Sequence, residues 1–309
     1  MKAAIYIRRS SGKCLELVDI EPPVPRKGEV LIKAYAASVN PLDWRLKSPH
    51  PGVDVAGEIV SVGSAVTCFK PGDKVFGVGR GSFAEYVRAT ESKVVAKPDN
   101  ITFEEAASVP VAGLTALQGL RDKGSLAPGH KVLINGAAGG VGTFAVQMAK
   151  AFGAEVTGVC STKNVEMVRS LGADVVIDYT QQDFTCDKKR YDLLLDNVGN
   201  RTLAELRRVL APGGRCVLAG APKQLGPTLL RMLDAIVRST FLHQKFVFFI
   251  ARFRQGDMEL LGTLMQTGKI HTVIDRQYPL NDTGEAIAYV KTGHARGKVV
   301  VIPGREHQW

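Results

Sequence analysis

One stretch of the chain limits its possible folds more than any other, the segment VLINGAAGGVGTFAVQMAK at residues 132–150. It opens with an uninterrupted apolar run of strand length, and such a run predicts a β-strand buried on both faces. Glycines follow at positions 136, 139, 140 and 142, and they permit a tight turn before the helical pattern that ends the segment. A strand, a glycine turn and a helix in this order predict the first unit of a doubly wound parallel sheet.

The alternation of apolar runs and helical patterns continues beyond this segment. Runs such as VVID and LLLD lack a polar alternation, as expected for strands that helices cover on both faces. The fold class is therefore α/β with a doubly wound parallel sheet, and we assign residues 113–256 to this domain. The predicted strands are Lys131 to Asn135, Glu155 to Cys160, Asp174 to Asp178, Tyr191 to Asp196 and Arg215 to Ala219, and the predicted helices are Gly140 to Phe152, Asn164 to Leu171 and Thr202 to Leu210.

The segments on either side differ in character. Residues 1–112 carry glycine and proline at short intervals with valine-rich runs between them, which predicts a compact β-rich domain. Its predicted strands are Glu29 to Tyr35, Asp54 to Val62, Asp73 to Gly77 and Phe83 to Arg88. Residues 257–309 are expected to return to that domain through a helix near Met258 to Thr267, a strand near Val273 to Tyr278, a helix from Thr283 to Lys291 with Asn281 or Asp282 as N-cap, and a last strand from Lys298 to Ile302.

Composition excludes several classes of protein. With 45% hydrophobic and 23% charged residues among 309, the chain has the composition of a folded globular protein and not of a disordered one. No apolar stretch approaches the roughly 20 residues of a membrane span, and the N-terminus lacks the apolar core of a secretory signal. Five scattered cysteines without a CxxC pair favour a reducing compartment, and we predict a cytoplasmic protein. The net charge of +10 favours anionic partners.

The glycine turn has the spacing of a dinucleotide fingerprint. Ala137, Gly139 and Gly142 fit its A-x-G-x-x-G form. A pyrophosphate binds there on the N–H groups of a helix N-terminus, and only residues with almost no side chain let the backbone come that close. A tight turn without a ligand is the alternative. We expect a dinucleotide to contact Gly136, Ala138, Gly139, Gly140 and Val141.

The end of the second predicted strand indicates which dinucleotide binds. A protein that prefers NAD carries Asp or Glu about 20 residues after the glycines, where the carboxylate binds the ribose hydroxyls. Here the strand ends in Cys160 and is followed by Ser161, Thr162 and Lys163. Two hydroxyls and an amine without an acid suit a 2′-phosphate, so we predict NADP (NADPH) as the cofactor. Lys163 has an alternative role as a solvated residue in the first turn of a helix.

Several further motifs resemble those of one protein family. They are Ser38-Val39-Asn40-Pro41-Leu42-Asp43-Trp44, Gly52 to Val60, Val62-Gly63 leading to Phe69 to Val75, and Gly113-Leu114-Thr115-Ala116 ahead of the glycine turn. Together they resemble the medium-chain dehydrogenase/reductase superfamily, and within it the zinc-free quinone oxidoreductase branch, over nearly the whole chain. The resemblance implies a GroES-like N-terminal domain, an inserted Rossmann domain, a C-terminal return and an active site in the cleft between them. It also implies a homodimer.

The chain departs from the zinc-dependent relatives at the positions of their metal ligands. Those proteins carry a Cys where this chain has Asn40, and a His-Glu pair where it has Val53 and Asp54. Residues 69–159 contain no cysteine, and the six histidines show no metal spacing. We therefore predict a protein without a metal site.

This lack of metal ligands bears on the reaction. Without a metal Lewis acid, reduction of an activated acceptor is easier than oxidation of an alcohol. Quinones and carbonyl-conjugated alkenes accept hydride readily, so the protein need only hold the nicotinamide against the acceptor and exclude water. We predict hydride transfer from NADPH to a quinone or an α,β-unsaturated carbonyl, as the branch resemblance also implies.

The resemblance places the loop with Asn40, Asp43 and Trp44 against the nicotinamide, and these three are the candidate catalytic residues. Asn40 is expected to hydrogen-bond a cofactor ribose or the substrate carbonyl. Asp43 is either catalytic or a turn-stabilising side chain, since Asn-Pro-x-Asp is ordinary turn chemistry. Trp44 either lines the substrate pocket or fills the core. Many relatives carry a Tyr near this loop, and its absence here leaves the proton donor unnamed, with solvent and a cofactor hydroxyl as options.

Other candidate cofactor contacts follow strands of the parallel sheet or come from the resemblance. Thr115, by resemblance, touches the nicotinamide, with a local cap or a packing role as the alternative. Tyr179 follows a strand at the edge where cofactors bind, and it either contacts the adenosine phosphate or is a surface side chain. Asn197, Val198 and Gly220 also follow strands, and similar motifs in the family face the cofactor.

Two candidates come from the C-terminal part of the chain. Phe248 and Phe249 belong to an apolar run that relatives place beside the nicotinamide carboxamide, although core packing explains such a run as well. Lys298 begins the final strand, and it either reaches a cofactor phosphate or is a solvated strand start.

A protein that is not an enzyme is the alternative from another class. A dinucleotide-binding fold also serves as an NADPH sensor or as a nucleic-acid or membrane-surface binder, and the basic, Phe-rich stretch at 231–254 mimics an amphipathic membrane-binding patch. The basic residues are spread over the whole chain, however, and aromatic residues make up only 7% of it. We therefore expect a small-molecule partner and no nucleic acid.

Overall fold

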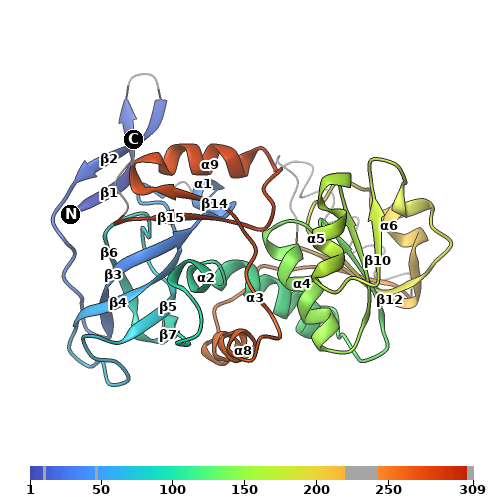
Figure 1. Ribbon diagram of the computed structural model, residues 1–309, viewed down its shortest axis with the longest axis horizontal. Coiled ribbons are helices and arrows are strands. Elements are labelled where there is room, and N and C mark those ends of the chain that lie inside the picture. The colour runs from blue at the N-terminus through green and yellow to red at the C-terminus, as the bar shows by residue number, and fades with distance from the viewer. Residues whose placement is uncertain (10–11, 46–47, 220–242, 305–309) are drawn as a thin grey trace. The chain divides into compact units, whose positions relative to one another are not determined.

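The computed structural model describes residues 1–9, 12–45, 48–219 and 243–304 (Figure 1). The chain divides into two compact units, one made of Met1–Ala112 and Phe253–Trp309 and the other of Gly113–Arg252. The chain therefore leaves the first unit and comes back to it at Phe253. The sequence analysis placed this return four residues later, at residue 257.

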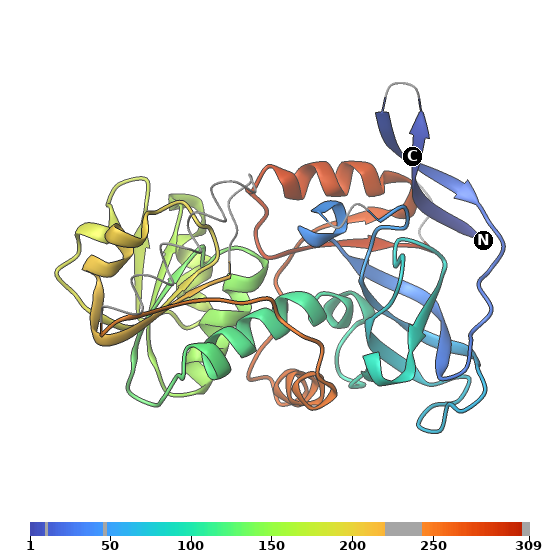
Figure 2. The same ribbon diagram turned by 180° about the vertical axis from the view of Figure 1, so that it is seen from behind.

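The second unit, coloured green to orange in Figures 1 and 2, is built on six parallel strands in the order β10-β9-β8-β11-β12-β13. From β8 the chain builds β9 and β10 on one side and then β11 and β12 on the other, which makes β8 and β11 the switch point of a doubly wound sheet. The predicted α/β class is thereby confirmed. The strands are β8 (Lys131–Asn135), β9 (Glu155–Cys160), β10 (Val175–Asp178), β11 (Tyr191–Asp196), β12 (Leu210–Leu218) and β13 (Lys245–Phe248).

Helices cover this sheet. α4 (Gly140–Ala151) packs on β8 and β9, α5 (Val165–Ser170) on β9 and β10, and α6 (Leu203–Arg208) on β12. Because the central strands β8, β9 and β11 are buried almost throughout, their sequences are apolar without alternation. The prediction was wrong about the start of β12, which lies at Leu210 and not at Arg215, because its pairing with β11 continues across a register shift.

The first unit contains a mixed sheet in the order β14-β15-β3-β4-β5-β7, with β6 also paired to β3. The C-terminal segment completes this sheet, since β15 pairs with β3 antiparallel and with β14 parallel. The core of the sheet is aliphatic, with Val30, Ile32, Val55, Ile59 and Val75 fully buried. The strands are β3 (Glu29–Ser38), β4 (Asp54–Val62), β5 (Lys74–Val78), β6 (Tyr86–Thr90), β7 (Val94–Ala96), β14 (Ile274–Pro279) and β15 (Lys298–Ile302).

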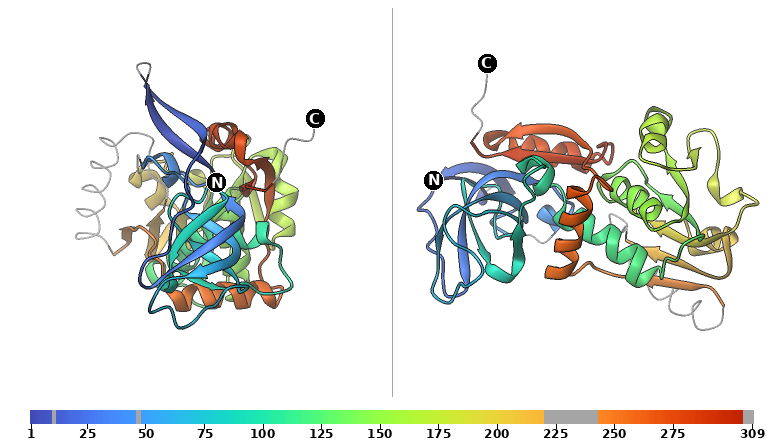
Figure 3. Two further views of the ribbon diagram at one scale, coloured as in Figure 1. Left: turned by 90° about the vertical axis from the view of Figure 1, so that its left-hand side faces the viewer. Right: turned by 60° about the horizontal axis from the view of Figure 1, so that its bottom comes forward.

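Three strands of this unit were not predicted. β1 (Lys2–Arg9) and β2 (Gly12–Asp19) form an antiparallel hairpin of their own, visible in Figure 3, and β7 is the third. Most described residues of the hairpin are half-buried or exposed, so the apolar alternation that identifies a strand is weak there.

Short helices complete the first unit. They include α1 (Leu42–Arg45), α2 (Phe103–Ala107), α8 (Gln255–Gln266) and α9 (Thr283–Lys291), which packs on β15 (Figure 1). Asp282, one of the two predicted N-caps of α9, is the N-cap residue, but its side chain makes no capping bond. Thr283 Oγ1 donates to the Leu280 carbonyl. α3 (Pro110–Gln118) joins the two units along the chain. Within the described ranges, no helix combines the length and the apolar character needed to cross a bilayer.

The β3–β4 pairing requires a glycine at position 57. A Cβ at Gly57 would lie well under 3.0 Å from the Lys33 carbonyl oxygen, because the strands approach closely beside a register shift. We expect Gly57→Ala to destabilise the protein by roughly 2 kcal/mol or more, as in other overpacked cores. Gly262→Ala is the matched control: a Cβ there meets Phe76 Cζ at 3.7 Å inside α8, and helix propensity favours alanine by about 1 kcal/mol. Urea unfolding should give opposite signs, and equal effects would contradict this account of β3–β4.

Candidate active site

The glycine turn after β8 has a backbone that requires its glycines. Gly136 has φ +80°, in the left-handed region that side chains rarely adopt, and a Cβ on Gly142 would collide with the Gly136 carbonyl oxygen. Gly139 is the N-cap of the 12-residue helix α4 and provides no side-chain cap. The N–H groups of the first turn are therefore available to a ligand, and together with the helix dipole they suit a pyrophosphate.

Asn197 and Val198 lie directly against this turn. A Cβ on Gly136 would meet Val198 Cγ2 at 2.7 Å and Asn197 Cβ at 3.6 Å. Asp196, fully buried at the end of β11, holds the loop by accepting hydrogen bonds from the Val198 N–H (3.2 Å) and from Asn135 Nδ2 (2.9 Å). Both polar atoms of the Asn197 side chain are buried without a hydrogen-bond partner among the described residues. Since an unpaired buried amide is unfavourable, this position fits a polar ligand such as a dinucleotide.

The residues predicted to bind a 2′-phosphate gather at the ends of β9 and β10. Ser161, Thr162 and Lys163 follow β9, and Thr162 Oγ1 donates to Asp178 Oδ2 at 2.6 Å. The N–H of Tyr179 donates to the last carbonyl of β9 at 3.0 Å, and its side chain is 51% exposed. Lys163 is exposed in a short 3-10 turn, which agrees with its alternative role as a solvated residue. An exposed amine is also accessible to a phosphate, and that contact stays a prediction.

Asp178 at this edge was missed by the sequence analysis. Hydrogen bonds from Thr162 Oγ1 and from the N–H and hydroxyl of Thr180 hold the pKa of the Asp178 carboxyl below its usual range. The group is therefore ionised at neutral pH, and its charge opposes that of a phosphate. Its position as the last residue of the strand after β9 is the signal that could have identified it.

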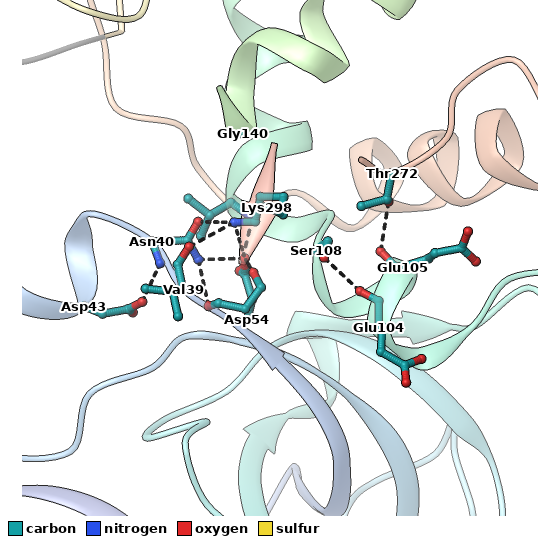
Figure 4. A network of polar contacts seen from close by, with 12 residues as sticks. Val39, Asn40, Asp43, Asp54, Glu104, Glu105, Ser108, Gly140, Thr272 and Lys298 are labelled. Carbon is teal, nitrogen blue, oxygen red and sulfur yellow. Dashed lines mark hydrogen bonds and ion pairs between the residues drawn. The ribbon is translucent and has the colours of Figure 1, made fainter. Parts of the chain in front are cut away.

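A network of buried polar residues lies within the first unit (Figure 4). Asn40 and Asp43 belong to the loop and helix after β3, Asp54 begins β4 and Lys298 begins β15, and none of the four is more than 3% exposed. Lys298 Nζ donates to Asn40 Oδ1 at 2.6 Å and to the Val39 carbonyl at 3.3 Å, and it lies 3.8 Å from Asp54 Oδ2. Lys298 is therefore not a solvated strand start, and its amine is held inside this unit.

Asn40 has its amide group fully committed as a donor. Its Nδ2 donates to Asp54 Oδ2 at 2.8 Å and to the Ser38 carbonyl at 3.2 Å, which uses both amide hydrogens. Its Oδ1 must face Lys298, because an ammonium group cannot accept a hydrogen bond. Asn40 can thus accept one more bond from a hydroxyl, such as that of a ribose, but has no hydrogen left for a substrate carbonyl.

Burial shifts the pKa of each ionisable residue in the network, Asp43, Asp54 and Lys298. It raises the pKa of the Asp54 carboxyl and lowers that of the Lys298 amine, while each partner's charge partly opposes the change. Burial also raises the pKa of Asp43 to about 7, with the charge of Asp54 adding to the increase and the hydrogen bond from the Asn40 N–H (2.6 Å) opposing it. The network holds two carboxyl groups and one amine, so one carboxyl lacks a compensating charge.

Asp43 does stabilise the turn, as one of its two predicted roles required. Its Oδ2 accepts the Asn40 N–H, whereas its Oδ1 is buried without a partner in the described part of the chain. Trp44 packs against the core cluster of Leu280, Ile287 and Val299, which favours its core role.

Comparison with known proteins places this chain in a family. Residues 26–99 match the family pattern described as alcohol dehydrogenase GroES-like domain, and residues 171–301 match the one described as zinc-binding dehydrogenase. A chloroplast envelope quinone oxidoreductase homolog of Arabidopsis thaliana is 37% identical over 314 residues, covering 94% of each chain. The chain belongs to the medium-chain dehydrogenase/reductase superfamily. Within that superfamily it falls in the quinone oxidoreductase-like branch, as predicted.

Two further relatives support the branch. An NADPH-dependent alkenal/one oxidoreductase of Arabidopsis thaliana, also named chloroplastic, is 35% identical and is matched over 98% of this chain and 80% of its own. The solved structure of the quinone oxidoreductase from Coxiella burnetii has a TM-score of 0.86 at 31% identity, covering 98% of this chain and 99% of that one. Superfamily membership accounts for the two units, one GroES-like and one with the parallel sheet.

The remaining candidates of the superfamily resemblance either lie in or beside described elements or fall outside the described residues, and their cofactor contacts stay predictions. Phe248 packs against the core cluster of the second unit, and the Phe249 ring lies 3.3 Å from the position of a Cβ on Gly119, so both make packing contacts while remaining half-buried. Thr115 lies within α3, half buried, and does not cap the helix. Gly220 is outside the described residues. So is much of the stretch 231–254, and its described Phe246 is only 6% exposed, which does not suit a membrane-binding face.

Metal ligands are not gathered anywhere in the residues that the structure describes. No group of three or more His, Cys, Asp or Glu side chains is placed there to hold an ion. Where zinc-dependent members of the superfamily carry ligands, this chain has Asn40 and Asp54, and the Lys298 amine lies between them. Asp54 and Ser38 were not predicted as site residues, although the Ser38 hydroxyl donates to Asp54 Oδ2 at 2.8 Å. The signal for Asp54 was its alignment with the His-Glu pair of the zinc-dependent relatives.

The Lys298–Asp54 pair should be strongly coupled. Lys298→Met leaves the Asp54 carboxylate buried without a counter-charge, and we expect a loss of about 3–5 kcal/mol in the free energy of unfolding. Lys298→Met combined with Asp54→Asn should lose clearly less than the sum of the single changes, measured by urea unfolding as a double-mutant cycle. Lys150→Met, which breaks the surface pair with Asp174 (2.7 Å), should cost about 1 kcal/mol or less. Additive effects at Lys298 and Asp54 would contradict the buried pairing.

Proposed function

We propose that the protein is a zinc-independent oxidoreductase that transfers hydride from NADPH to a quinone or an α,β-unsaturated carbonyl. The observation that carries the proposal is the glycine turn that opens α4, with the unpartnered amide of Asn197 beside it. The names of the relatives, quinone oxidoreductase and alkenal/one oxidoreductase, support the two acceptor classes.

The residues present fit a dinucleotide, and each has a definite task. The first-turn N–H groups of α4 hold the pyrophosphate, and the glycines at 136 and 142 allow its close approach. Asn197 provides a donor and an acceptor to polar groups of the cofactor. NADPH, when bound, supplies the hydride. The protein's part is to bind, orient and exclude water, which is positioning catalysis.

The preference for NADPH over NADH belongs to the proposal and rests on charge at the ends of β9 and β10. Ser161 and Lys163 offer a hydroxyl and a cation to a 2′-phosphate, whereas the hydroxyl hydrogen of Thr162 is already donated to Asp178. The Asp178 carboxylate repels a 2′-phosphate, but it is stabilised by hydrogen bonds from the Thr162 and Thr180 hydroxyls. Tyr179, the next residue along the chain, adds an exposed side chain with a hydroxyl. The single cation Lys163 therefore decides the balance.

Cofactor selectivity tests this arrangement. Wild-type protein should oxidise NADPH with a naphthoquinone and with an enone, at a lower KM than for NADH. Lys163→Ala should raise the KM for NADPH about tenfold and leave that for NADH unchanged, because one charge-assisted hydrogen bond at an exposed site is lost. Lys188→Ala, which removes another exposed lysine of the same unit, should change neither. A wild-type preference for NADH, or equal weakening of both cofactors by Lys163→Ala, would refute the NADPH assignment.

Zinc independence is also part of the proposal. A divalent ion near Asn40 and Asp54 would meet the Lys298 amine, which already donates to Asn40 at 2.6 Å and lies 3.8 Å from Asp54. We expect elemental analysis of the purified protein to find less than about 0.1 zinc per chain, with activity unchanged by a chelator. Stoichiometric zinc that survives dialysis would overturn the proposal.

Three further features remain proposals that follow from the sequence. We propose a homodimer and a small-molecule partner, with no nucleic acid. We also propose a cytoplasmic location, on the ground of the scattered cysteines, although the two curated relatives described above carry chloroplast names. The non-catalytic NADPH sensor is the second candidate function, and the same NADPH oxidation assay separates it from the enzyme.

A further inference from the structure

We propose that the second unit has an additional anion site, separate from the glycine turn, in which three arginines bind the phosphate group of a small soluble molecule. The arginines line a hollow of about 400 Å³, and every residue that lines it belongs to the second unit. These residues are Arg190, Ala204, Arg207, Arg208, Leu210, Pro212 and Gln244. The site goes beyond the proposed hydride transfer and does not depend on it.

The hollow lies at the edge of the parallel sheet opposite the glycine turn. Arg190 directly precedes β11, Leu210 is the first residue of β12, and Gln244 directly precedes β13. Arg207 and Arg208 belong to α6, which packs on β12 (Figure 1). Because these strands and β8 are parallel, their first residues share one edge, whereas the glycine turn follows the end of β8. The six residues of β11 separate the two edges by about 20 Å.

Gln244 orients the guanidinium group of Arg207. Arg207 Nε donates to Gln244 Oε1 at 3.2 Å, and Gln244 Nε2 donates to the carbonyls of Leu210 at 3.0 Å and Ala211 at 3.3 Å. The glutamine thereby ties the arginine to the start of β12. The four N–H groups at the end of the guanidinium make no hydrogen bond within the described residues, so they are available to a ligand.

Arg190 is held by the turn that precedes it. Its Nη1 donates to the carbonyls of Asp187, Lys188 and Lys189 at 2.9 to 3.2 Å. The Asp187 carboxylate does not pair with Arg190, because it accepts from the Lys189 N–H at 3.0 Å and from the Tyr191 hydroxyl at 3.3 Å. Two of the three arginines are therefore fixed by hydrogen bonds before a ligand binds, which lowers the entropy lost on binding.

The three positive charges of the hollow have no carboxylate among the described residues that line it. The charge of Arg208 acts on Asp183 and Glu205, but the ion pairs of these two acids are with Arg201, at 3.2 and 3.9 Å. Like charges that face one hollow repel each other, and an anion bound between them removes this repulsion.

The helix dipole of α6 explains only part of this arrangement. Arg207 and Arg208 lie in the last turn of α6, where cations are favourable. That role requires neither the bond from Arg207 to Gln244 nor the presence of Arg190, which comes from a different segment of the chain. The convergence of the three side chains on one hollow is therefore the feature that indicates a ligand.

The donors in the hollow define the chemical class of the ligand. Guanidinium groups bind phosphate oxygens through pairs of N–H groups, and three of them suit an anion with at least two charges, such as a phosphate ester or a diphosphate. Ala204, Leu210 and Pro212 add a small apolar wall for the organic part of the molecule. A lipid head group also carries phosphate, but a concave site suits a soluble molecule better than a flat membrane surface.

Calorimetric titration with inorganic pyrophosphate tests the site. The protein is first saturated with NADP⁺ to occupy the glycine turn, and sodium chloride of equal ionic strength serves as the blank. Wild-type protein should bind one pyrophosphate per chain, and Arg207→Gln or Arg208→Gln should weaken binding about tenfold, because charge-assisted hydrogen bonds are lost. Arg207→Lys keeps the charge but loses the bond to Gln244, and it should weaken binding at least about threefold. Both arginines are exposed, so these variants should fold.

Arg169→Gln is the matched control. Arg169 is also an exposed arginine in the last turn of a short helix of the second unit, α5, but it pairs with Glu166 and does not line the hollow. This variant should bind pyrophosphate as the wild type does. Wild-type protein without binding, equal weakening by Arg169→Gln, or full affinity in Arg207→Gln or Arg207→Lys would each overturn the site.

Vesicles of phosphatidylcholine and phosphatidic acid test the other source of a phosphate group. Wild-type protein and Arg207→Gln should sediment with them to the same extent. Binding through Arg207 to these vesicles and not to pyrophosphate would overturn the assignment to a soluble ligand. Protein that binds pyrophosphate through Arg207 but does not oxidise NADPH defeats only the proposed function, and active protein without this binding defeats only the anion site.

Discussion

The buried pairing of Lys298 with Asp54 through Asn40 is the interaction on which the first unit and its chemistry depend. Removing an amine and a carboxylate from water is costly, so each must be held by several partners. The Asp54 carboxylate accepts from Ser38 and Asn40, and the amine donates to Asn40 and to the Val39 carbonyl. The pairing fixes the loop after β3 against β4 and β15, since a shift of any one segment would leave a charge unpaired.

This pairing also determines what the loop can do chemically. Because Asn40 gives both amide hydrogens to Asp54 and Ser38, it can accept from a cofactor hydroxyl but cannot activate a carbonyl. Because burial is only partly offset by one amine shared between two carboxyl groups, the pKa of Asp43 is raised to about 7. The proposed zinc independence rests on this amine, which lies where a metal ion would have to sit between Asn40 and Asp54.

The second unit relies on backbone more than on side chains. The pyrophosphate site that we propose consists of the first turn of α4 and the glycines that keep it open, so it follows from a short local segment. The proposed selectivity for NADPH depends instead on side chains that follow two strands, Lys163 after β9 and Asp178 at the end of β10. Pyrophosphate binding is therefore expected to tolerate sequence changes elsewhere in the unit, whereas cofactor selectivity should respond to single substitutions.

The sequence by itself determined the strands at 131–135, 155–160, 191–196 and 298–302 and the glycine turn, because strand patterns and glycine geometry are local properties of a few neighbouring residues. It did not reveal the hairpin of β1 and β2, whose faces are too mixed to show a pattern. Only the tertiary structure decided that Lys298 bonds to Asn40, 258 residues away, and that Asp178 lies beside Thr162. The reason is physical: burial and charge pairing arise from contacts between distant segments, and these contacts set whether a lysine is solvated or whether an aspartate keeps its proton.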